Sequence, residues 1–365
     1  MPYGNVHGLH WMYSRIISDL EKASVPVKEL HGPGAVAVTL AAGRIVALAF
    51  SKDGPNLLWA HPDLGDAALV RANGLVGGIG GDRLWFSPEL RYHWIGKPDW
   101  RGLGNYQVPA DTDPGRYRFV DSEPGVVALA AEGRLPVQGS DESLAFSVQR
   151  KIHMAPAPLS HDHPAMRGVQ YVGIECDHEL TLQEETRTGE IDLWQLLQTP
   201  VGSIVIVPLR AGHRGQPLSY GLPGDWQTTS NSLIWRITGN TNAKIGIAAP
   251  ALTGRAAILR WLPSKRWCLI VRQFPVDEAA RYGDYPAGMP RDDQVFQAWD
   301  GLGFGEIEFH SPVLDGARGP HSLRQADQLW AFGGSARSIA ALADVLLQVD
   351  IEALLSPAQP SHRNS

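Results

Sequence analysis

The sequence predicts an all-β fold, a sandwich or barrel of antiparallel strands with a short helix near each end. Short runs rich in β-branched and aromatic residues recur along most of the chain, separated by turns with glycine or proline. Helical patterns do not alternate with these runs, as they would in a parallel α/β protein. The chain has 365 residues, of which 44% are hydrophobic, so it can bury a large core and is not a disordered protein.

The first element expected is an amphipathic helix within residues 1–24, where Trp11, Ile16 and Leu20 are interleaved with charged residues. A secretory signal would need an uninterrupted apolar middle, so we expect a cytoplasmic protein. No apolar run approaches the roughly 20 residues of a membrane-spanning helix. Cys176 and Cys268 lie in apolar runs, which favours buried reduced thiols over a disulfide.

The strands follow the first helix. A hairpin is expected from residues 35–40 and 44–50, joined by Ala41-Ala42-Gly43. Further strands are expected at residues 125–131, 143–154, 169–185, 203–208, 232–238, 243–249, 256–261, 266–274, 304–310 and 328–332. A second helix is predicted over residues 335–348, with Ser335 as its N-cap. We interpret residues 25–355 as a single β domain and residues 356–365 as a flexible tail.

Composition and missing motifs exclude several functions. The formal net charge of -6 is unlike that of a nucleic-acid-binding protein, and no segment suits a membrane partner. The sequence has no GxSxG elbow, HExxH motif, P-loop or GxGxxG motif. Two cysteines cannot form a thiolate zinc site, and we expect no cofactor.

Residues 73–101 form the segment richest in functional side chains. Trp85, His93 and Trp94 lie among charged residues such as Arg83 and Glu89. Flat aromatic faces can stack on sugar rings, and arginine and carboxylate groups can bind paired hydroxyls, so this stretch predicts carbohydrate binding. The alternative is a long loop whose tryptophans close the end of the sandwich.

A histidine pair is the second candidate. In an extended segment His161 and His163 point the same way, with His153 just upstream. They could bind a metal, if Glu175, Asp177 or His178 supplied a third ligand, or provide an acid near neutral pH. The alternative is a pair of solvated loop histidines, and we do not expect a metal.

The third candidate is the strand over residues 304–310. Period-two alternation places Glu306, Glu308 and His310 on one face, with Ile307 and Phe309 on the other. A carboxylate beside a histidine can transfer protons. The alternative is an ordinary exposed sheet face.

Two further residues have simpler interpretations. Lys244 is alone on an apolar strand, so it lies either at a sheet edge or in the binding region. Trp194 and Trp235 are expected in the core.

These motifs resemble the galactose mutarotase-like superfamily, which includes the aldose 1-epimerases. Residues 80–89, GGDRLWFSPE, are similar to a GGxRLWxxPE motif of uncharacterised bacterial mutarotase-like proteins. GRIVAL precedes this motif, and LWQLLQTPVG, KIGI and EIEFHSP follow it in the same order as in the family, so the resemblance spans roughly residues 36–332. It implies a large antiparallel β-supersandwich that binds a sugar.

The resemblance also implies a mechanism. In the epimerases of this superfamily a glutamate removes the proton of the anomeric hydroxyl while a histidine protonates the ring oxygen. Glu308 lies where that glutamate is expected. Val76 stands where the N-x-x-HGG segment has a histidine, and the segment around Leu193 and Trp194 replaces the other histidine motif.

The sequence therefore leaves three hypotheses. The first is an epimerase-like enzyme acting by acid–base chemistry on a sugar; its catalytic candidates are Glu308 as base and His161, His163 or His310 as acid. The second is a lyase that performs β-elimination on a uronic acid, using the cations among residues 83–101. The third is a sugar-binding or sensing module without catalysis.

The same interpretation predicts the kind of ligand, the residues that bind it and the oligomeric state. The expected partner is a mono- or oligosaccharide, with an acidic sugar as one option, and the chain is expected to be a monomer or homodimer. The candidate substrate-binding residues are Arg71, Asn73, Arg83, Trp85, Glu89, His93, Trp94, His153 and Lys244.

Overall fold

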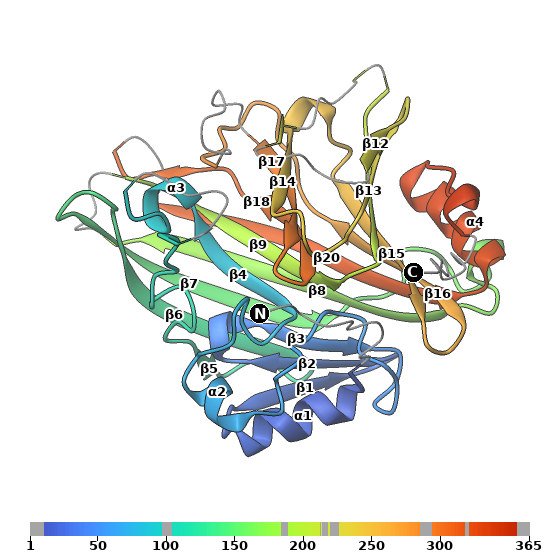
Figure 1. Cartoon of the computed structure of the whole chain (residues 1–365), viewed down its shortest axis with the longest axis horizontal. Helices are drawn as coiled ribbons and strands as arrows, with labels where there is room; N and C mark the ends of the chain where they lie inside the picture. Colours follow the sequence, from blue (N-terminus) through green and yellow to red (C-terminus); the bar gives the residue numbers. More distant parts are fainter. Residues whose placement is uncertain are drawn as a thin grey trace, which may run out of the picture.

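Two antiparallel β-sheets packed face to face make up most of the molecule, which confirms the all-β prediction (Figure 1). The computed structural model describes residues 11–96, 104–183, 189–211, 213, 218–219, 226–284, 294–317 and 321–355. The expected helix residues 1–10 and the tail 356–365 lie outside the described residues, as do residues 97–101 of the aromatic stretch.

The first sheet carries the candidate site. Its strand order is β1 (Val27–His31), β2 (Ala35–Thr39), β3 (Ile45–Ala49), β4 (Asp82–Ser87), β9 (Glu190–Pro200), β18 (Phe304–His310), β17 (Gln294–Gly301), β14 (Ala243–Ala248) and β11 (Leu218–Ser219). The short β19 (Leu314–Asp315) pairs with β9 outside this order.

The second sheet packs against the inner face of the first. Its order is β12 (Trp226–Thr228), β13 (Ser232–Arg236), β10 (Ile204–Pro208), β15 (Arg255–Leu262), β16 (Arg266–Gln273), β20 (Ser322–Gly334), β8 (Gln170–Leu182), β7 (Ser143–Met154), β6 (Val126–Pro136) and β5 (Arg118–Val120).

The helices in the described residues are short and lie around the sheets (Figure 1). They are α1 (Tyr13–Lys22), α2 (Ala67–Arg71), α3 (Glu89–Tyr92) and α4 (Ala336–Leu347), with 3-10 turns η1 (Ala41–Gly43), η2 (Pro164–Met166), η3 (Ala249–Ala251) and η4 (Glu352–Leu354). As predicted, Ser335 caps α4, since its Oγ accepts the Ser338 amide at 3.2 Å. No described helix is long and apolar enough to span a bilayer.

Eight of the described strands were absent from the sequence prediction, namely β1, β4, β5, β9, β11, β12, β17 and β19. Strand β9 is buried along nearly all of its length, and β4 along all of it. In both strands apolar and polar residues occur on each face, so the sequence shows no period-two alternation. The aromatic stretch is therefore not only a loop, because Arg83 and Trp85 belong to β4.

The main core fills the space between the sheets. Leu84, Leu193 and Ile307 of the first sheet pack there with Ile152 and Ile270 of the second. Helix α4 instead covers the outer face of β16 and β20, and α1 covers the β1–β3 end of the first sheet. The outer face of β4, β9, β18, β17 and β14 is left for the polar cluster described below.

A buried network of charges also joins the sheets. Arg272 on β16 pairs with both Asp82 (Nη2 to Oδ2, 2.5 Å) on β4 and Asp327 on β20. Arg150 adds a second guanidinium to Asp82 at 3.2 Å, and His178 lies 2.9 Å from Asp327. The positive charges of Arg150 and Arg272 balance the negative charges of Asp82 and Asp327, so this is an internal ion-pair network. The two arginines would repel a metal ion placed beside Asp327 and His178.

The two cysteines confirm the prediction of reduced thiols. Cys176 and Cys268 are both free and buried. Burial raises the pKa of each thiol to about 12, so neither forms a reactive thiolate at neutral pH.

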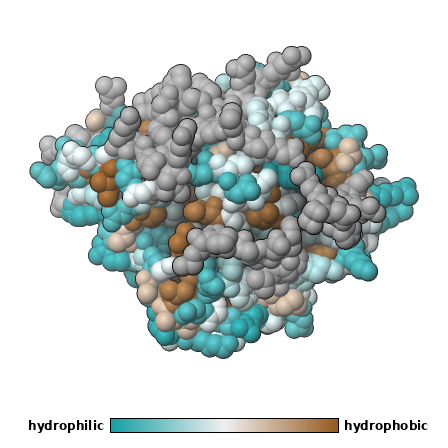
Figure 2. Space-filling view, in the orientation of Figure 1, coloured by the Kyte–Doolittle hydropathy of each residue, from teal (hydrophilic) through white to brown (hydrophobic). Residues whose placement is uncertain are grey.

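The surface facing the viewer in Figure 2 is mostly hydrophilic where it is coloured, with hydrophobic residues in small separate groups. Scattered apolar residues of this kind are ordinary on a protein surface.

Candidate functional site

Strand β18 presents its acidic residues on the outer face of the first sheet. Ile307 and Phe309 point into the core between the sheets, so Glu306, Glu308 and His310 point the other way. All three are buried there. The alternation predicted for this strand is present, but the face is not an ordinary exposed one.

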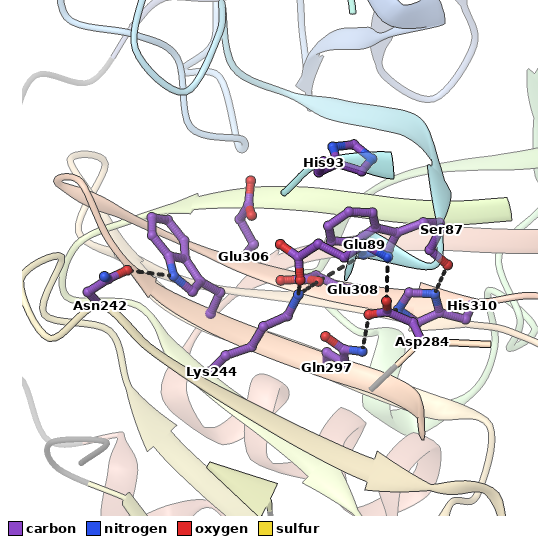
Figure 3. A network of polar contacts seen from close by, with 12 residues as sticks. Ser87, Glu89, His93, Asn242, Lys244, Asp284, Gln297, Glu306, Glu308 and His310 are labelled. Atoms are coloured by element: carbon purple, nitrogen blue, oxygen red, sulfur yellow. Dashed lines mark hydrogen bonds and ion pairs between the residues drawn. The ribbon is translucent and has the colours of Figure 1, made fainter. Parts of the chain in front are cut away.

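Glu308 lies at the centre of the cluster and is only 1% exposed. The Nζ atom of Lys244, on β14, lies 3.0 Å from its Oε2 atom. Trp194, on β9, donates its indole N–H to the same oxygen at 2.8 Å. Lys244 also contacts Glu89 Oε2 at 3.1 Å, so one ammonium is shared by two carboxylates (Figure 3).

The environment of Glu308 changes its acidity. Burial raises the pKa of this carboxyl to about 7; Lys244 lowers it, while Glu306 and Glu89 raise it further. Both protonation states are therefore populated near neutral pH. A carboxyl of this kind can accept a proton and give it back.

His310 is held by acidic groups on two sides. Its Nδ1 atom lies 3.1 Å from Asp192 Oδ1 and 3.1 Å from Ser87 Oγ, while Nε2 lies 3.8 Å from Asp284 Oδ2. Burial alone would lower the pKa of His310, but Asp192 and Asp284 outweigh it and raise the pKa above its usual value. The imidazole is therefore favoured in its protonated form.

Asp284 connects His310 to the Glu308 group. Its Oδ1 atom accepts the backbone N–H of Glu89 at 2.6 Å, and its Oδ2 atom accepts the side-chain amide of Gln297 at 2.8 Å (Figure 3). Asp284 thereby fixes the start of α3, which places Glu89 beside Lys244.

Glu306 has a cation of its own. Arg83 Nη2 lies 2.7 Å from Glu306 Oε1, and Gln198 donates to the same oxygen at 3.0 Å. Both Arg83 and Gln198 also donate to the backbone carbonyl of Gly77. The Arg83 guanidinium lies 3.8 Å from the centre of the Trp85 ring, a cation–π contact that fixes both side chains.

His93 is packed between aromatic rings. It stacks against Trp85 at 5.4 Å and against Tyr106 at 5.6 Å. Burial lowers the pKa of His93 to about 4, so the ring is neutral at pH 7. Nε2 lies 3.0 Å from the Phe86 carbonyl oxygen, which can only accept, and this places the ring proton on Nε2.

Most of the candidate residues from β4 onward come together in this cluster. The structure brings together Arg83, Trp85, Glu89, His93, Lys244, Glu308 and His310. Trp94 lies beside them, with its ring 5.0 Å from that of Tyr106. Lys244 extends its buried side chain into this cluster.

Two candidate substrate-binding residues lie elsewhere on the first half of the chain. Arg71 is exposed at the end of α2, where it donates to the backbone of Lys22. Asn73 occupies an exposed turn with a φ of 50°. Both follow the short helix α2, which packs against α1 rather than against the cluster.

The other three candidate histidines lie on or beside the second sheet. His153 points from the outer face of β7 toward Asp177, at 3.8 Å. His161 and His163 precede η2, which packs against α4. Since Glu308 lies on the outer face of the opposite sheet, none of the three can supply its acid. Of their suggested third metal ligands, His178 is engaged by Asp327 in the core.

Several members of the cluster were not predicted as functional. Trp194 is buried, as predicted, but its hydrogen bond to Glu308 was not expected, and Asp192, Asp284 and Gln297 were not singled out. Asp192, Trp194 and Gln198 share one face of β9 because their positions differ by even numbers. If residues 190–200 are predicted as a strand, this spacing alone places the three side chains on one face.

The chain matches one family model over most of its length. A model of the family of unknown function DUF6786 matches residues 35–356, which covers every strand of both sheets except β1. The chain belongs to this family. A search of curated proteins finds no match. Membership of DUF6786 thus carries no activity with it.

Solved structures give a weaker likeness. The chain is similar to a "Putative aldose 1-epimerase" from Escherichia coli K12, with 13% identity and a TM-score of 0.45, over 84% of this chain and 99% of that one. It is also similar to a galactose mutarotase-like protein from Lactobacillus casei ATCC 334, with 11% identity and a TM-score of 0.43, over 85% and 99%. Similarity at this level assigns no activity to a DUF6786 member.

Proposed function

We propose that this chain catalyses proton transfer on a carbohydrate, in an epimerase-like opening and closing of a sugar ring. The observation that carries the proposal is Glu308. It is a buried carboxyl with a pKa raised to about 7, and it is held at Oε2 by Lys244 and Trp194. A group whose pKa lies near the working pH is suited to act as a base and then as an acid.

The proposed reaction uses Glu308 and His310. Glu308 Oε1 removes the proton of the anomeric hydroxyl while the bond from the anomeric carbon to the ring oxygen breaks. The ring oxygen takes the proton from His310 Nε2, which gives an open-chain aldehyde. After rotation about the bond next to that carbonyl, both protons return along the same paths and the ring closes as the other anomer.

The surroundings of His310 support its role as the acid. Asp192 and Ser87 hold Nδ1, so the ring cannot turn freely. Nε2 forms no hydrogen bond with any described residue, and its distance of 3.8 Å from Asp284 is too long for one. The proton on Nε2 is therefore not committed to a strong partner. His93 is unsuited to the role because its low pKa leaves it neutral.

Aromatic residues beside the carboxylates support a sugar as the substrate. Trp299 is half-buried on β17, directly opposite Glu306 in the strand register. Its indole N–H donates to Asn242 at 3.2 Å, and its ring lies 5.2 Å from that of Phe304. A ring fixed in this way can stack against the C–H face of a sugar. The motif resemblance to aldose 1-epimerases points to the same class of substrate.

The charge pattern favours ring opening over β-elimination. A lyase needs a cation to neutralise the carboxylate of a uronic acid. Lys244 and Arg83, the cations nearest to Glu308 and Glu306, are already paired with glutamates.

The test is exchange between anomers, measured by saturation-transfer NMR on a panel of aldoses at equilibrium. The wild-type protein should accelerate exchange for at least one sugar. Glu308→Gln should lower the rate by about 10²-fold or more while the sugar still binds. Glu179→Gln, on the outer face of β8 beside Arg324, is the matched control and should leave the rate unchanged.

The possible results separate enzyme from binding module. Binding without any acceleration by the wild type would refute the catalytic proposal and leave a sugar-binding protein. Acceleration that survives Glu308→Gln would refute the assignment of the base.

A further inference from the structure

The cluster around Glu308 holds more buried carboxylates than cations. Lys244 serves both Glu89 and Glu308. In the same way, the single ring of His310 lies between Asp192 and Asp284. The group around Lys244 and the group around His310 therefore each contain two carboxyls and one cation.

The neighbouring Arg83–Glu306 ion pair does not supply the missing positive charge. Arg83 and Glu306 form a pair of one cation and one carboxylate. The cluster as a whole is thus negative unless a carboxyl takes up a proton. Buried negative charge without a partner is unfavourable, so the site favours a positively charged or proton-donating ligand.

The same face also has buried acceptors without donors. Among the described residues, no hydrogen bond reaches His93 Nδ1, Gln198 Oε1, Gln297 Oε1 or Asp192 Oδ2. The amide orientations are fixed, because Gln198 Nε2 donates to the Gly77 carbonyl and Gln297 Nε2 donates to Asp284.

Unpaired donors are fewer. Near the cluster they are Arg44 Nε, Arg83 Nε and His310 Nε2, and the last of these lies close to Asp284. The cluster therefore has spare capacity to accept hydrogen bonds, in addition to its negative charge. A carboxylate ligand, which only accepts, would fit it poorly.

We propose that the ligand of this site is an amino sugar, bound with its protonated amine against the carboxylates of the cluster. This inference rests on the proposed function, that a sugar binds beside Glu308. An ammonium group brings three donors and a positive charge, which are what the cluster lacks. Uronic acids are excluded because they would add a further carboxylate.

The charge of the bound amine has a second consequence. Glu306 and Glu89 raise the pKa of Glu308 because they are negative neighbours. A cation placed among them acts in the opposite direction and favours ionised Glu308. Binding of an amino sugar should therefore release protons near pH 7, whereas a neutral sugar should release far fewer.

The test is isothermal titration calorimetry at about pH 6.5, where a sugar amine is mostly protonated. The ligands are glucosamine, glucose, N-acetylglucosamine and glucuronate, followed by the corresponding galactose set. The amino sugar of one set should bind at least about tenfold more tightly than its neutral and N-acetylated forms. Titrations in two buffers of different ionisation enthalpy should show the proton release.

Two variants locate the effect. Glu89→Gln removes one negative charge and keeps the shape of the side chain, so it should reduce several-fold the preference for the amine, which is the ratio of the amino-sugar affinity to the neutral-sugar affinity. Glu179→Gln makes the same change of charge on the second sheet and should preserve the preference.

The outcomes distinguish this inference from the proposed function. Equal or tighter binding of the neutral sugar, or of the uronate, would overturn the inference, while the proposed function would stand. If no sugar of any charge binds, both fail. An unchanged preference in Glu89→Gln would overturn the placement of the amine in this cluster.

Discussion

Lys244 Nζ and Glu308 Oε2 lie 3.0 Å apart on the outer face of the first sheet, and both side chains are buried. Strand β17 separates the strands that carry them, and Lys244 extends from β14 to reach β18. This explains the isolated lysine on an apolar strand, because its ammonium group forms ion pairs with Glu308 and Glu89.

Replacement of this lysine should expose the dependence of the two glutamates on one cation. Lys244→Met keeps most of the apolar stem and removes the charge. We expect the free energy of unfolding to fall by roughly 3–5 kcal/mol at about pH 8, and by less at about pH 5, where the carboxyls can take up protons. Urea unfolding at both pH values measures this.

Lys151→Met is the matched control for that variant. Lys151 is exposed on β7, and its replacement should change the free energy of unfolding by about 0.5 kcal/mol or less. An equal loss for Lys244→Met at both pH values would contradict the shared ion pair.

Ionisation of Glu308 should weaken the fold. Its pKa is raised from 4.5 to about 7, so the folded protein binds this proton more tightly than the unfolded chain. Stability from this group is therefore full below about pH 4.5 and is lost as the pH rises through about 7. Relative to wild type, Glu308→Gln should gain about 3 kcal/mol between these limits, as measured by urea unfolding across the pH range. A constant difference would show that the carboxyl is not perturbed.

His310 should set the alkaline limit of activity. Glu308 must be ionised and His310 protonated, so the rate should rise with pH near 7 and fall where His310 loses its proton, above its usual pKa. His310→Asn should lower the rate of anomer exchange by about 10²-fold or more and remove the alkaline limb. A rate that still falls at alkaline pH in the variant would assign that limb to another group.

The same shift predicts how His310 affects stability. A raised histidine pKa contributes stability that is complete below about pH 6.5 and is lost as the pH rises through the folded value. The loss of unfolding free energy in His310→Asn should therefore be larger at about pH 6 than at about pH 9. The opposite order would show that Asp192 and Asp284 do not hold the imidazolium.

The charge network between the sheets should be essential to the fold. Arg272→Met leaves Asp82 and Asp327 short of a buried cation, and we expect a loss of about 3–5 kcal/mol in the free energy of unfolding. Arg324→Met, at an exposed ion pair with Glu179, should change it by about 0.5 kcal/mol or less. Similar effects in both variants would remove the energetic distinction between the two arginines.

The sequence could predict those elements whose pattern is local. Strand β18 shows clear alternation, so the shared face of Glu306, Glu308 and His310 followed from spacing alone. Helix α4 followed from its apolar period and from Ser335 as a cap. Strands β4 and β9 did not follow, because apolar and polar residues occur on each of their faces and the sequence shows no alternation.

The site depends on contacts that no local pattern contains. Trp194 and Glu308 are 114 positions apart, and only the pairing of β9 with β18 brings them together. His161 and His163 have a suggestive spacing, but the chain carries them to the second sheet beside α4. Spacing shows which side chains share a face, whereas sheet order decides which faces meet.

Strand β4 alternates charge as well as direction, since Asp82 meets arginines in the core and Arg83 meets Glu306 on the outer face. A slip of one residue in its pairing would exchange these two positions. Asp82 would then confront Glu306, and Arg83 would be driven into a buried space that already holds Arg150 and Arg272. Misaligned pairings of this strand are therefore penalised twice, by repulsion on each face. The adjacent residues Asp82 and Arg83 therefore favour the correct pairing register of β4 during folding, in addition to any role in binding.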